Sequence, residues 1–251
     1  MNKRSRLAAL ACLILALVTA GAAVAEEQTE PSFDRVGSIV TFGRYEQDGD
    51  EENGPEGIRW IVLDAQEGKS LLLSLYALDA APYHPKSKNI TWKDCALRKW
   101  LNREFLQAAF TKDEQQAILT TKVDNGRKQG WKKWKKTKGG KNTKDRIFLL
   151  SVAEAIQYLG VSRNGSDDPL APAELTEYAL RKSAGFTGPG GHRWSDGDPA
   201  CGYWWLRSPG YVQVDAAYVN GRGTLVEGSV IWEEACVRPA FWLDLGAAGN
   251  N

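Results

Sequence analysis

Two arginines lie inside apolar segments of the C-terminal third of the chain, where a guanidinium needs hydrogen-bond partners. Arg207 follows Tyr-Trp-Trp-Leu and precedes Ser-Pro-Gly, and Arg238 lies in the run Val-Arg-Pro-Ala-Phe-Trp-Leu of residues 237–243. Burial of such a group is costly unless its donors are bonded. Each arginine therefore either binds an anionic ligand or pins loops through backbone carbonyls and carboxylates, which is the commoner use. We take Arg207 and Arg238 as candidate ligand-binding residues.

The two tryptophans before Arg207 have different expected roles. Trp204 and Trp205 are consecutive, so their side chains point to opposite faces of the expected strand. One indole then belongs to the core, and the other is either a stacking platform for a sugar or is covered by a loop. Trp204 is the candidate for the platform.

Residues 126–138, the basic segment, interleave lysine with tryptophan. Residues 127–146 contain ten Lys or Arg and one Asp, a net charge of +9. Ammonium groups resist burial without partners, so we expect an exposed loop that is flexible without ligand. Polyanion binding combines charge neutralisation with stacking on aromatic rings, although a solvated insertion is the equal alternative. The candidate residues for polyanion binding are Trp131, Trp134, Lys132, Lys133, Lys135 and Lys136.

The N-terminus has the pattern of a bacterial secretory signal. Three basic residues precede the apolar stretch 7–24, and Ala23-Val24-Ala25 fits a cleavage site. We expect residues 1–25 to be the signal peptide, 26–35 a polar linker and 36–245 one domain. The mature chain is then secreted or held at the cell envelope, with no transmembrane segment. Nucleic acid is not the expected partner of such a chain, whereas wall teichoic acids, acidic glycans and anionic lipid headgroups are available outside the cell.

Three cysteines follow the signal: Cys95, Cys201 and Cys236. They allow one disulfide and one thiol, or no disulfide. With no Cys-x-x-Cys and only two distant histidines, a zinc site is not expected. The acidic residues 48–54 fail the calcium-loop pattern because the sixth position is Asn53 and the twelfth is Arg59. No serine-hydrolase motif occurs either, and we expect no cofactor.

The order of predicted elements indicates an α+β fold. Three strands are expected over 38–45, 58–63 and 70–75, and they fit an antiparallel meander. Helices follow, one capped by Thr91, one over 112–119 capped by Thr111 and one over 152–158 capped by Ser151. Residues 160–202 are rich in Gly, Pro, Asp and Ser, with helical character only over 173–181. Strands then close the chain, the last of them returning to the first three. The residues expected to be mostly buried are Trp60, Leu72, Trp100, Leu101, Phe105, Phe148, Trp205, Leu206, Phe241 and Trp242.

The ordered motifs resemble those of a known family. The motifs IRWIVL, LLLS, TWKDCALRKWLNREFLQAAF, DRIFLLS, WWLRSPG and VRPAFWL follow one another from Val36 to Leu245. In this order they resemble a secreted bacterial domain-of-unknown-function family, number 6273. The pattern is similar to that of C-type-lectin-like and formylglycine-generating-enzyme-like domains. The resemblance implies an antiparallel sheet with flanking helices and a long loop-rich region, C-type-lectin-like.

The resemblance also bears on the cysteines and on function. A lectin-like chain often ties its first helix to its last strand, which here pairs Cys95 with Cys236; the rival pairing is Cys201 with Cys236. The favoured function is a non-catalytic recognition or scaffold domain, expected to be monomeric, that binds an extracellular glycan, an anionic wall polymer or a protein. The alternative is an oxidoreductase like the formylglycine-generating enzymes, which hold copper between two cysteines.

Overall fold

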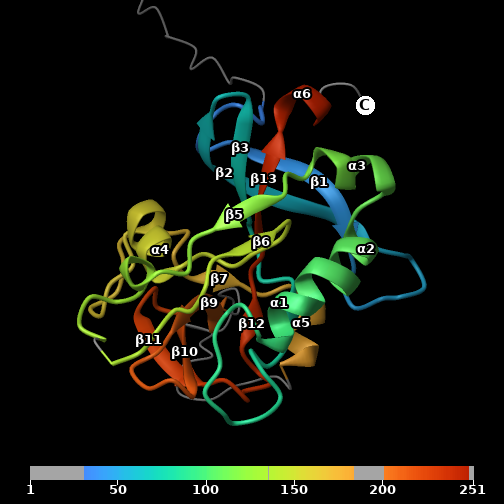
Figure 1. Cartoon of the computed structure of the whole chain (residues 1–251). Helices are drawn as coiled ribbons and strands as arrows, with labels where there is room; N and C mark the ends of the chain where they lie inside the picture. Colours follow the sequence, from blue (N-terminus) through green and yellow to red (C-terminus); the bar gives the residue numbers. More distant parts are fainter. Residues whose placement is uncertain (1–30, 135, 184–200, 249–251) are drawn as a thin grey trace, which may run out of the picture. The chain divides into compact units, whose positions relative to one another are not determined.

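Two sheets organise the computed structural model, which describes residues 31–134, 136–183 and 201–248 (Figure 1). The predicted signal peptide, residues 26–30 of the predicted linker and Lys135 lie outside these residues. The first sheet has the order β1-β2-β3-β13 and is antiparallel throughout. Its strands are β1 (Ile39–Tyr45), β2 (Glu56–Gln66), β3 (Lys69–Ser74) and β13 (Ala240–Asp244).

The meander and the returning strand are both confirmed. β2 and β3 are joined by Glu67 and Gly68, whose φ angles of 50° and 75° suit a tight hairpin turn. β13 pairs with β3, with Phe241 opposite Leu72. The ends of the domain therefore meet in one sheet, whose inner face packs the Trp60 ring 4.7 Å from the Phe241 ring.

The second sheet has the order β11-β10-β9-β12-β4 and places its longest strand at its centre. Its strands are β4 (Asp79–Ala80), β9 (Trp204–Pro209), β10 (Asp215–Val219), β11 (Leu225–Ser229) and β12 (Cys236–Val237). Every residue of β9 is buried. Asn220 turns the chain between β10 and β11, and its side-chain oxygen accepts from the backbone N–H of Arg222 and of Thr224. Two short pairs complete the strands: β5 (Thr121–Val123) with β6 (Thr143–Asp145), and β7 (Ala173–Glu174) with β8 (Cys201–Gly202).

Helices are short, so the fold is α+β with mostly β structure, as the sequence predicts in outline. The predicted caps Thr111 and Ser151 are confirmed, and each forms a capping box, Thr111 with Glu114 as expected and Ser151 with Glu154. The helices of the described residues are α1 (Ala96–Trp100), a π-helical turn (Leu101–Phe105), α2 (Leu106–Ala109), α3 (Lys112–Ala117), a 3-10 turn (Arg127–Gln129), α4 (Val152–Leu159), α5 (Glu177–Lys182) and α6 (Leu245–Ala248).

Two helix boundaries differ from the prediction. The first helix is capped by the Cys95 side chain, which accepts from the Arg98 backbone N–H, and not by Thr91. Helical structure expected over 173–181 begins only after Thr176, because Ala173 and Glu174 pair with β8. A local sequence pattern does not reveal such a pairing.

Eight of the ten residues expected in the core are buried, and Trp100 and Trp242 are partly exposed. Alternation explains Trp242: Phe241 and Leu243 point inward from β13, so Trp242 points outward, where Lys69 covers its ring at 5.3 Å. Across the described residues, no helix has the length and apolar character needed to cross a membrane.

The structure corrects the predicted Cys95–Cys236 disulfide, because both residues are free thiols. Cys95 caps α1 and its thiol contacts the Trp92 carbonyl at 3.3 Å. Cys236 lies in β12, between Trp204 of β9 and Ala80 of β4. The two residues therefore serve different elements, and the rival pairing of Cys236 with Cys201 is absent as well.

Candidate functional site

Strand β9 places Trp204 and Trp205 in the core of the protein. Both indoles are fully buried, and each donates its N–H to a backbone carbonyl at 3.0 Å: Trp204 to Ala171 and Trp205 to Ala81. The face of Trp204 also lies 5.1 Å from the Arg238 guanidinium. Trp204 is therefore packed under other residues, which corrects its assignment as a sugar platform.

Arg238 pins the point where the chain crosses between the two sheets. It lies between β12 of the second sheet and β13 of the first, and it is fully buried. Its three nitrogen groups donate to the carbonyls of Ser74, Leu75 and Leu170 at 2.9, 3.3 and 2.6 Å. Burial lowers the pKa of Arg238 to about 9, and the nearby Asp168 charge opposes that shift. Each of its three nitrogens thus donates to a backbone carbonyl, so Arg238 has a structural role here.

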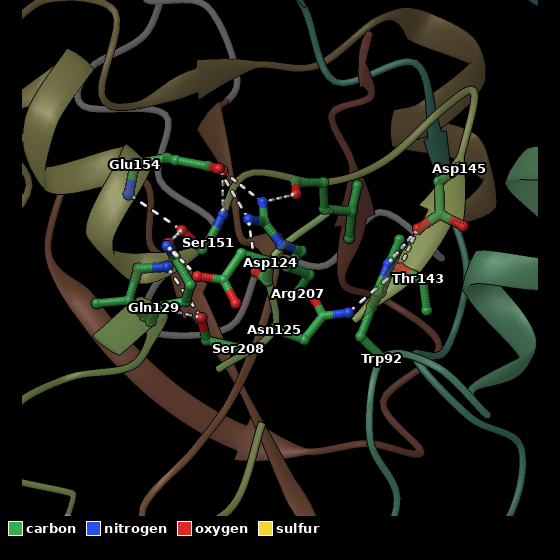
Figure 2. A network of polar contacts seen from close by, with 12 residues as sticks. Trp92, Asp124, Asn125, Gln129, Thr143, Asp145, Ser151, Glu154, Arg207 and Ser208 are labelled. Carbon is green, nitrogen blue, oxygen red and sulfur yellow. Dashed lines mark hydrogen bonds and ion pairs between the residues drawn. The ribbon is translucent and has the colours of Figure 1, made fainter. Parts of the chain in front are cut away.

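Arg207 has a different environment, near the end of β9. Its guanidinium forms a two-pronged ion pair with Glu154, in which Nη2 lies 2.7 Å from Oε1 and Nη1 contacts Oε2 (Figure 2). Nη1 also donates to the Leu149 carbonyl at 2.8 Å and Nη2 to the Asp124 carbonyl at 3.1 Å. Arg207 is 3% exposed, whereas the Glu154 side chain is 27% exposed. The pair therefore joins β9 to the N-terminus of α4 and to the chain just before the basic segment.

Polar side chains around this pair hold the start of the basic segment in place (Figure 2). The Ser208 hydroxyl donates to the Gln129 carbonyl at 2.7 Å, and the Ser151 hydroxyl donates to the Gln129 side chain at 2.8 Å. The Gln129 amide in turn donates to Asp124 at 3.2 Å. A hydrogen bond from the Gly126 N–H, followed by that of Gln129, holds the pKa of Asp124 below its usual value. Hydrogen bonds from charged and neutral side chains thus hold the start of the basic segment against β9 and the N-terminus of α4.

The base of the same connection is closed by a second network. Asn125 donates its side-chain amide to the Lys141 carbonyl and to the Thr143 hydroxyl, at 3.1 and 3.2 Å. Thr143 donates to the buried Asp145 at 2.6 Å, and Trp92 donates its indole N–H to Asp145 at 2.9 Å (Figure 2). The chain between β5 and β6 is a loop whose ends are tied together, as in an Ω-loop.

The basic segment presents its lysines outward and turns its second tryptophan inward. Lys132, Lys133 and Lys136 are exposed, as expected from their charge. Trp134 is only 8% exposed and lies 5.9 Å from the Arg163 guanidinium, so it fills the inside of the loop and is not an exposed ligand platform. Trp131 is partly buried, and Lys135 lies outside the described residues.

A small cavity lies under the basic segment, beside Arg207. Its volume is about 10 Å³, and its lining includes Trp131, Trp134 and Thr137. Asn125 and Arg207 also line it, and the buried Asn125 side-chain oxygen and Arg207 Nε have no hydrogen-bond partner among the described residues.

A larger groove lies on the outer side of the basic segment, against α4. Its volume is about 480 Å³, and Trp131, Ala153 and Ile156 form its apolar wall. Lys128, Lys132 and Lys133 line the same groove. Trp131 also borders the small cavity, so its indole separates the outer groove from the docked underside. The groove combines an aromatic surface with three ammonium groups, which is the chemistry of an anionic ligand that has an apolar or ring face.

The cysteines have the environment of structural thiols. Cys95, Cys201 and Cys236 are all buried. Burial raises the pKa of Cys95 to about 12, and burial also raises the pKa of Cys236 above its usual value. A Cβ at Gly202 would lie 3.0 Å from the Cys236 sulfur, so residue 202, and not its neighbour Cys201, faces that sulfur. Low thiolate character and burial disfavour metal binding or redox chemistry at Cys95 and Cys236.

An acidic cluster at the edge of the first sheet was not predicted from the sequence. Oxygen atoms of Glu46, Asp48 and Glu56 lie within 4.8 Å of one another. Backbone N–H groups already occupy much of this acceptor capacity: Gln47 donates to Glu56 at 2.7 Å and Gly49 to Glu46 at 2.6 Å. The cluster therefore serves to shape the loop between β1 and β2.

The docking residues beneath the basic segment were also missed by the sequence reasoning. Ser151 was predicted only as a helix cap, and Glu154, which completes its capping box, is the charged partner of Arg207. A capping carboxylate and a strand arginine more than fifty positions apart give no joint sequence signal. Gln129, Ser208 and Asn125 are polar residues in loops or at a strand end, and only the folded chain shows their partners.

A comparison with known families identifies the family of this chain. A family model described as "Domain of unknown function (DUF6273)" matches residues 67–245, a shorter stretch than the resemblance suggested from Val36 onward. The chain belongs to this family. No curated protein matches the chain, and no solved structure does.

Proposed function

We propose that this member of the DUF6273 family is a secreted or cell-envelope recognition domain without catalytic activity, which binds an anionic polymer through its basic segment. The observation that carries the proposal is the two-sided character of that segment. Its underside is docked through Gln129, to which Ser151 and Ser208 donate, beside the Arg207–Glu154 pair. Lys132, Lys133 and Lys136 are exposed, and within the described residues their ammonium groups have no ion pair, so their charge is available to a ligand.

The groove beside α4 favours an acidic glycan or a polyol phosphate of the cell wall. Three lysines line it and neutralise anionic groups, and Trp131 offers an aromatic face to a sugar ring or an aliphatic repeat. The net charge of +9 over residues 127–146 also steers a polyanion to this side of the molecule. The second candidate ligand is a protein partner with an acidic surface, which is also negatively charged.

A C-type-lectin-like arrangement is part of the proposal. The meeting of the first and last strands in one sheet supports it. In this arrangement the long connections between strands bind the ligand, and the sheets stabilise the fold. The alternative of a formylglycine-generating-type oxidoreductase rests on Cys201 and Cys236. It has less support, since both residues are buried and burial raises the pKa of the Cys236 thiol.

The experiment that tests the proposal is retention on immobilised heparin and on purified cell-wall polymer. Replacing Lys132, Lys133, Lys135 and Lys136 with Ser should abolish retention, because it removes most of the charge at the groove. Trp131→Ala should weaken retention on the glycan more than on a polyanion without rings. If the quadruple variant is retained as strongly as the parent, the basic segment is a solvated insertion and the proposal fails.

Export has its own test. Expressed in an exporting host, the chain should begin at Glu26 after cleavage following Ala25. Mass spectrometry of the purified protein measures this directly. An intact Met1, or a lipid on Cys12, would contradict the proposed route to the envelope.

A further inference from the structure

Three large apolar side chains are exposed at one end of the second sheet. Tyr211 and Val212, in the connection from β9 to β10, are 50% and 44% exposed, and Ile231, after β11, is 42% exposed. Scattered single apolar residues on a surface are ordinary. Three on neighbouring connections at the same end of a sheet call for an explanation.

Hydrogen bonds show that these connections lie side by side. The Val230 N–H donates to the Val214 carbonyl at 3.2 Å, which places Ile231 next to the Tyr211–Val212 turn. The Gln213 side-chain amide donates to the Ile90 carbonyl at 3.0 Å and to the Lys138 carbonyl at 3.1 Å. The His84 N–H donates to the Val230 carbonyl at 2.8 Å. The segments 84–90, 136–139, 211–213 and 230–233 thus form one surface, here called the loop end, at the lower side of Figure 1.

The loop end is basic as well as apolar. Its exposed lysines are Lys86, Lys88, Lys136 and Lys138, and Glu233 is the single carboxylate in these four segments. With His84 neutral, the four segments carry a net charge of +3. None of the three exposed apolar residues lines the cavity or the groove described above.

We propose that the loop end binds the surface of an anionic phospholipid bilayer. Tyr211, Val212 and Ile231 would enter the interfacial region, where a tyrosine ring suits the boundary between headgroups and acyl chains. The surrounding lysines lie at the level of anionic headgroups, and shallow apolar insertion with such charges gives reversible peripheral binding. The apolar side chains lie on separate loops, and lysines lie in the same segments. This arrangement fits a fluid bilayer surface better than it fits the flat, continuous interface of a protein partner.

This inference goes beyond the anionic-polymer site and does not depend on it. The groove is lined by Lys128, Lys132 and Lys133, whereas the loop end takes Lys136 and Lys138 from the far part of the basic segment. A domain with both surfaces would hold an envelope polymer close to the membrane.

The test is co-sedimentation of the purified chain with vesicles of phosphatidylcholine alone or mixed with phosphatidylglycerol. The chain offers a matched pair of variants: Val212→Ser with Ile231→Ser at the loop end, and Val36→Ser with Ile39→Ser at exposed sites elsewhere, where the parent residues are 60% and 37% exposed. The parent should bind the phosphatidylglycerol vesicles at low salt. The loop-end pair should lower the partition coefficient by about tenfold, and the control pair should leave it unchanged.

Lysine variants separate this surface from the groove. Lys86→Ser with Lys88→Ser should weaken vesicle binding by about tenfold and leave heparin retention nearly intact. Lys132→Ser with Lys133→Ser should show the opposite pattern. The inference is overturned if the parent fails to bind phosphatidylglycerol vesicles, or if the loop-end apolar pair binds them like the parent. It is also overturned if that pair changes only the oligomeric state, which would make the loop end a protein contact.

Discussion

Arg207 and Arg238 occupy equivalent sequence settings and opposite structural ones. Both interrupt an apolar strand segment, and both are buried. The three nitrogens of Arg238 donate hydrogen bonds to three backbone carbonyls, where the chain crosses between the two sheets. Arg207 pairs with the partly exposed carboxylate of Glu154 and leaves Nε without a partner among the described residues.

The difference teaches how a buried arginine serves either a core or a site. Carbonyls from two distant segments, Ser74–Leu75 and Leu170, surround Arg238, so removing it would leave the crossover between the sheets without these bonds. The partners of Arg207 lie on α4 and at the start of the basic segment, so it controls where that segment sits. We therefore expect global effects from changes at Arg238 and local effects from changes at Arg207.

The largest effect is expected from Arg238→Met. The variant leaves the carbonyls of Ser74, Leu75 and Leu170 buried without donors, and each such loss costs about 1–3 kcal/mol. We expect a fall of about 4–5 kcal/mol in the free energy of unfolding, measured by urea denaturation. Arg238→Lys should not restore it, because one ammonium cannot reproduce the planar fork. The exposed Arg103→Met is the control, and an equal, small loss in both variants would break the comparison.

A smaller and more local effect is expected from Arg207→Ala. The change removes the ion pair with Glu154 and the bonds to Leu149 and Asp124. We expect a loss of about 2–4 kcal/mol and much faster trypsin cleavage within residues 127–141 under native conditions. Arg238→Lys, compared at matched global stability, should not show this selective cleavage. Uniform cleavage throughout the domain would contradict a local role for Arg207.

The thiol beside Arg238 gives a pH-dependent effect that is smaller again. Burial raises the pKa values of Cys95 and Cys236 above the unfolded value of about 8.5. Their contribution to stability is therefore fully present below about pH 8.5 and is lost as the pH rises toward 12. We expect the urea midpoint to fall over this range, and to fall less in Cys236→Ala.

The same thiols test the corrected disulfide. Iodoacetamide under denaturing conditions, without reductant, should modify both Cys95 and Cys236, and under native conditions near neutral pH it should modify neither quickly. Peptide mapping by mass spectrometry reads the outcome. A pair of peptides joined by a Cys95–Cys236 disulfide would contradict the free thiols and support the disulfide predicted from the sequence.

The meander of the first sheet and two helix caps could be predicted from the sequence because their signals are local. Alternation indicates β1, short apolar runs indicate β2 and β3, and Thr111 and Ser151 mark the starts of α3 and α4. Thr91 failed as a cap because Cys95, four positions later, performs that function. Trp242 failed as a core residue because periodicity alone does not tell which face of an edge strand is covered.

The candidate site was only partly predictable, because charge indicates which side chains are exposed but contacts between distant residues depend on tertiary packing. Charge marked Lys132, Lys133 and Lys136 as exposed, since ammonium groups have few options when folded. Interleaved charge suggested that Trp134 is exposed too, yet the loop folds back and buries it. The partnership of Arg207 with Glu154 depends on tertiary packing, and no spacing in the chain encodes it.

The central claim is that the exposed lysines of a docked basic segment bind an anionic polymer. The most direct measurement is the dissociation constant of heparin as a function of salt, for Lys132→Ser with Lys133→Ser and for the matched control Lys112→Ser with Lys122→Ser. Both pairs remove two exposed positive charges. We predict that the first pair weakens binding at least tenfold at low salt and flattens the salt dependence, because contacts are lost, while the control pair changes it less than threefold. Equal weakening by the two pairs would show that only net charge matters and would contradict a site on the basic segment.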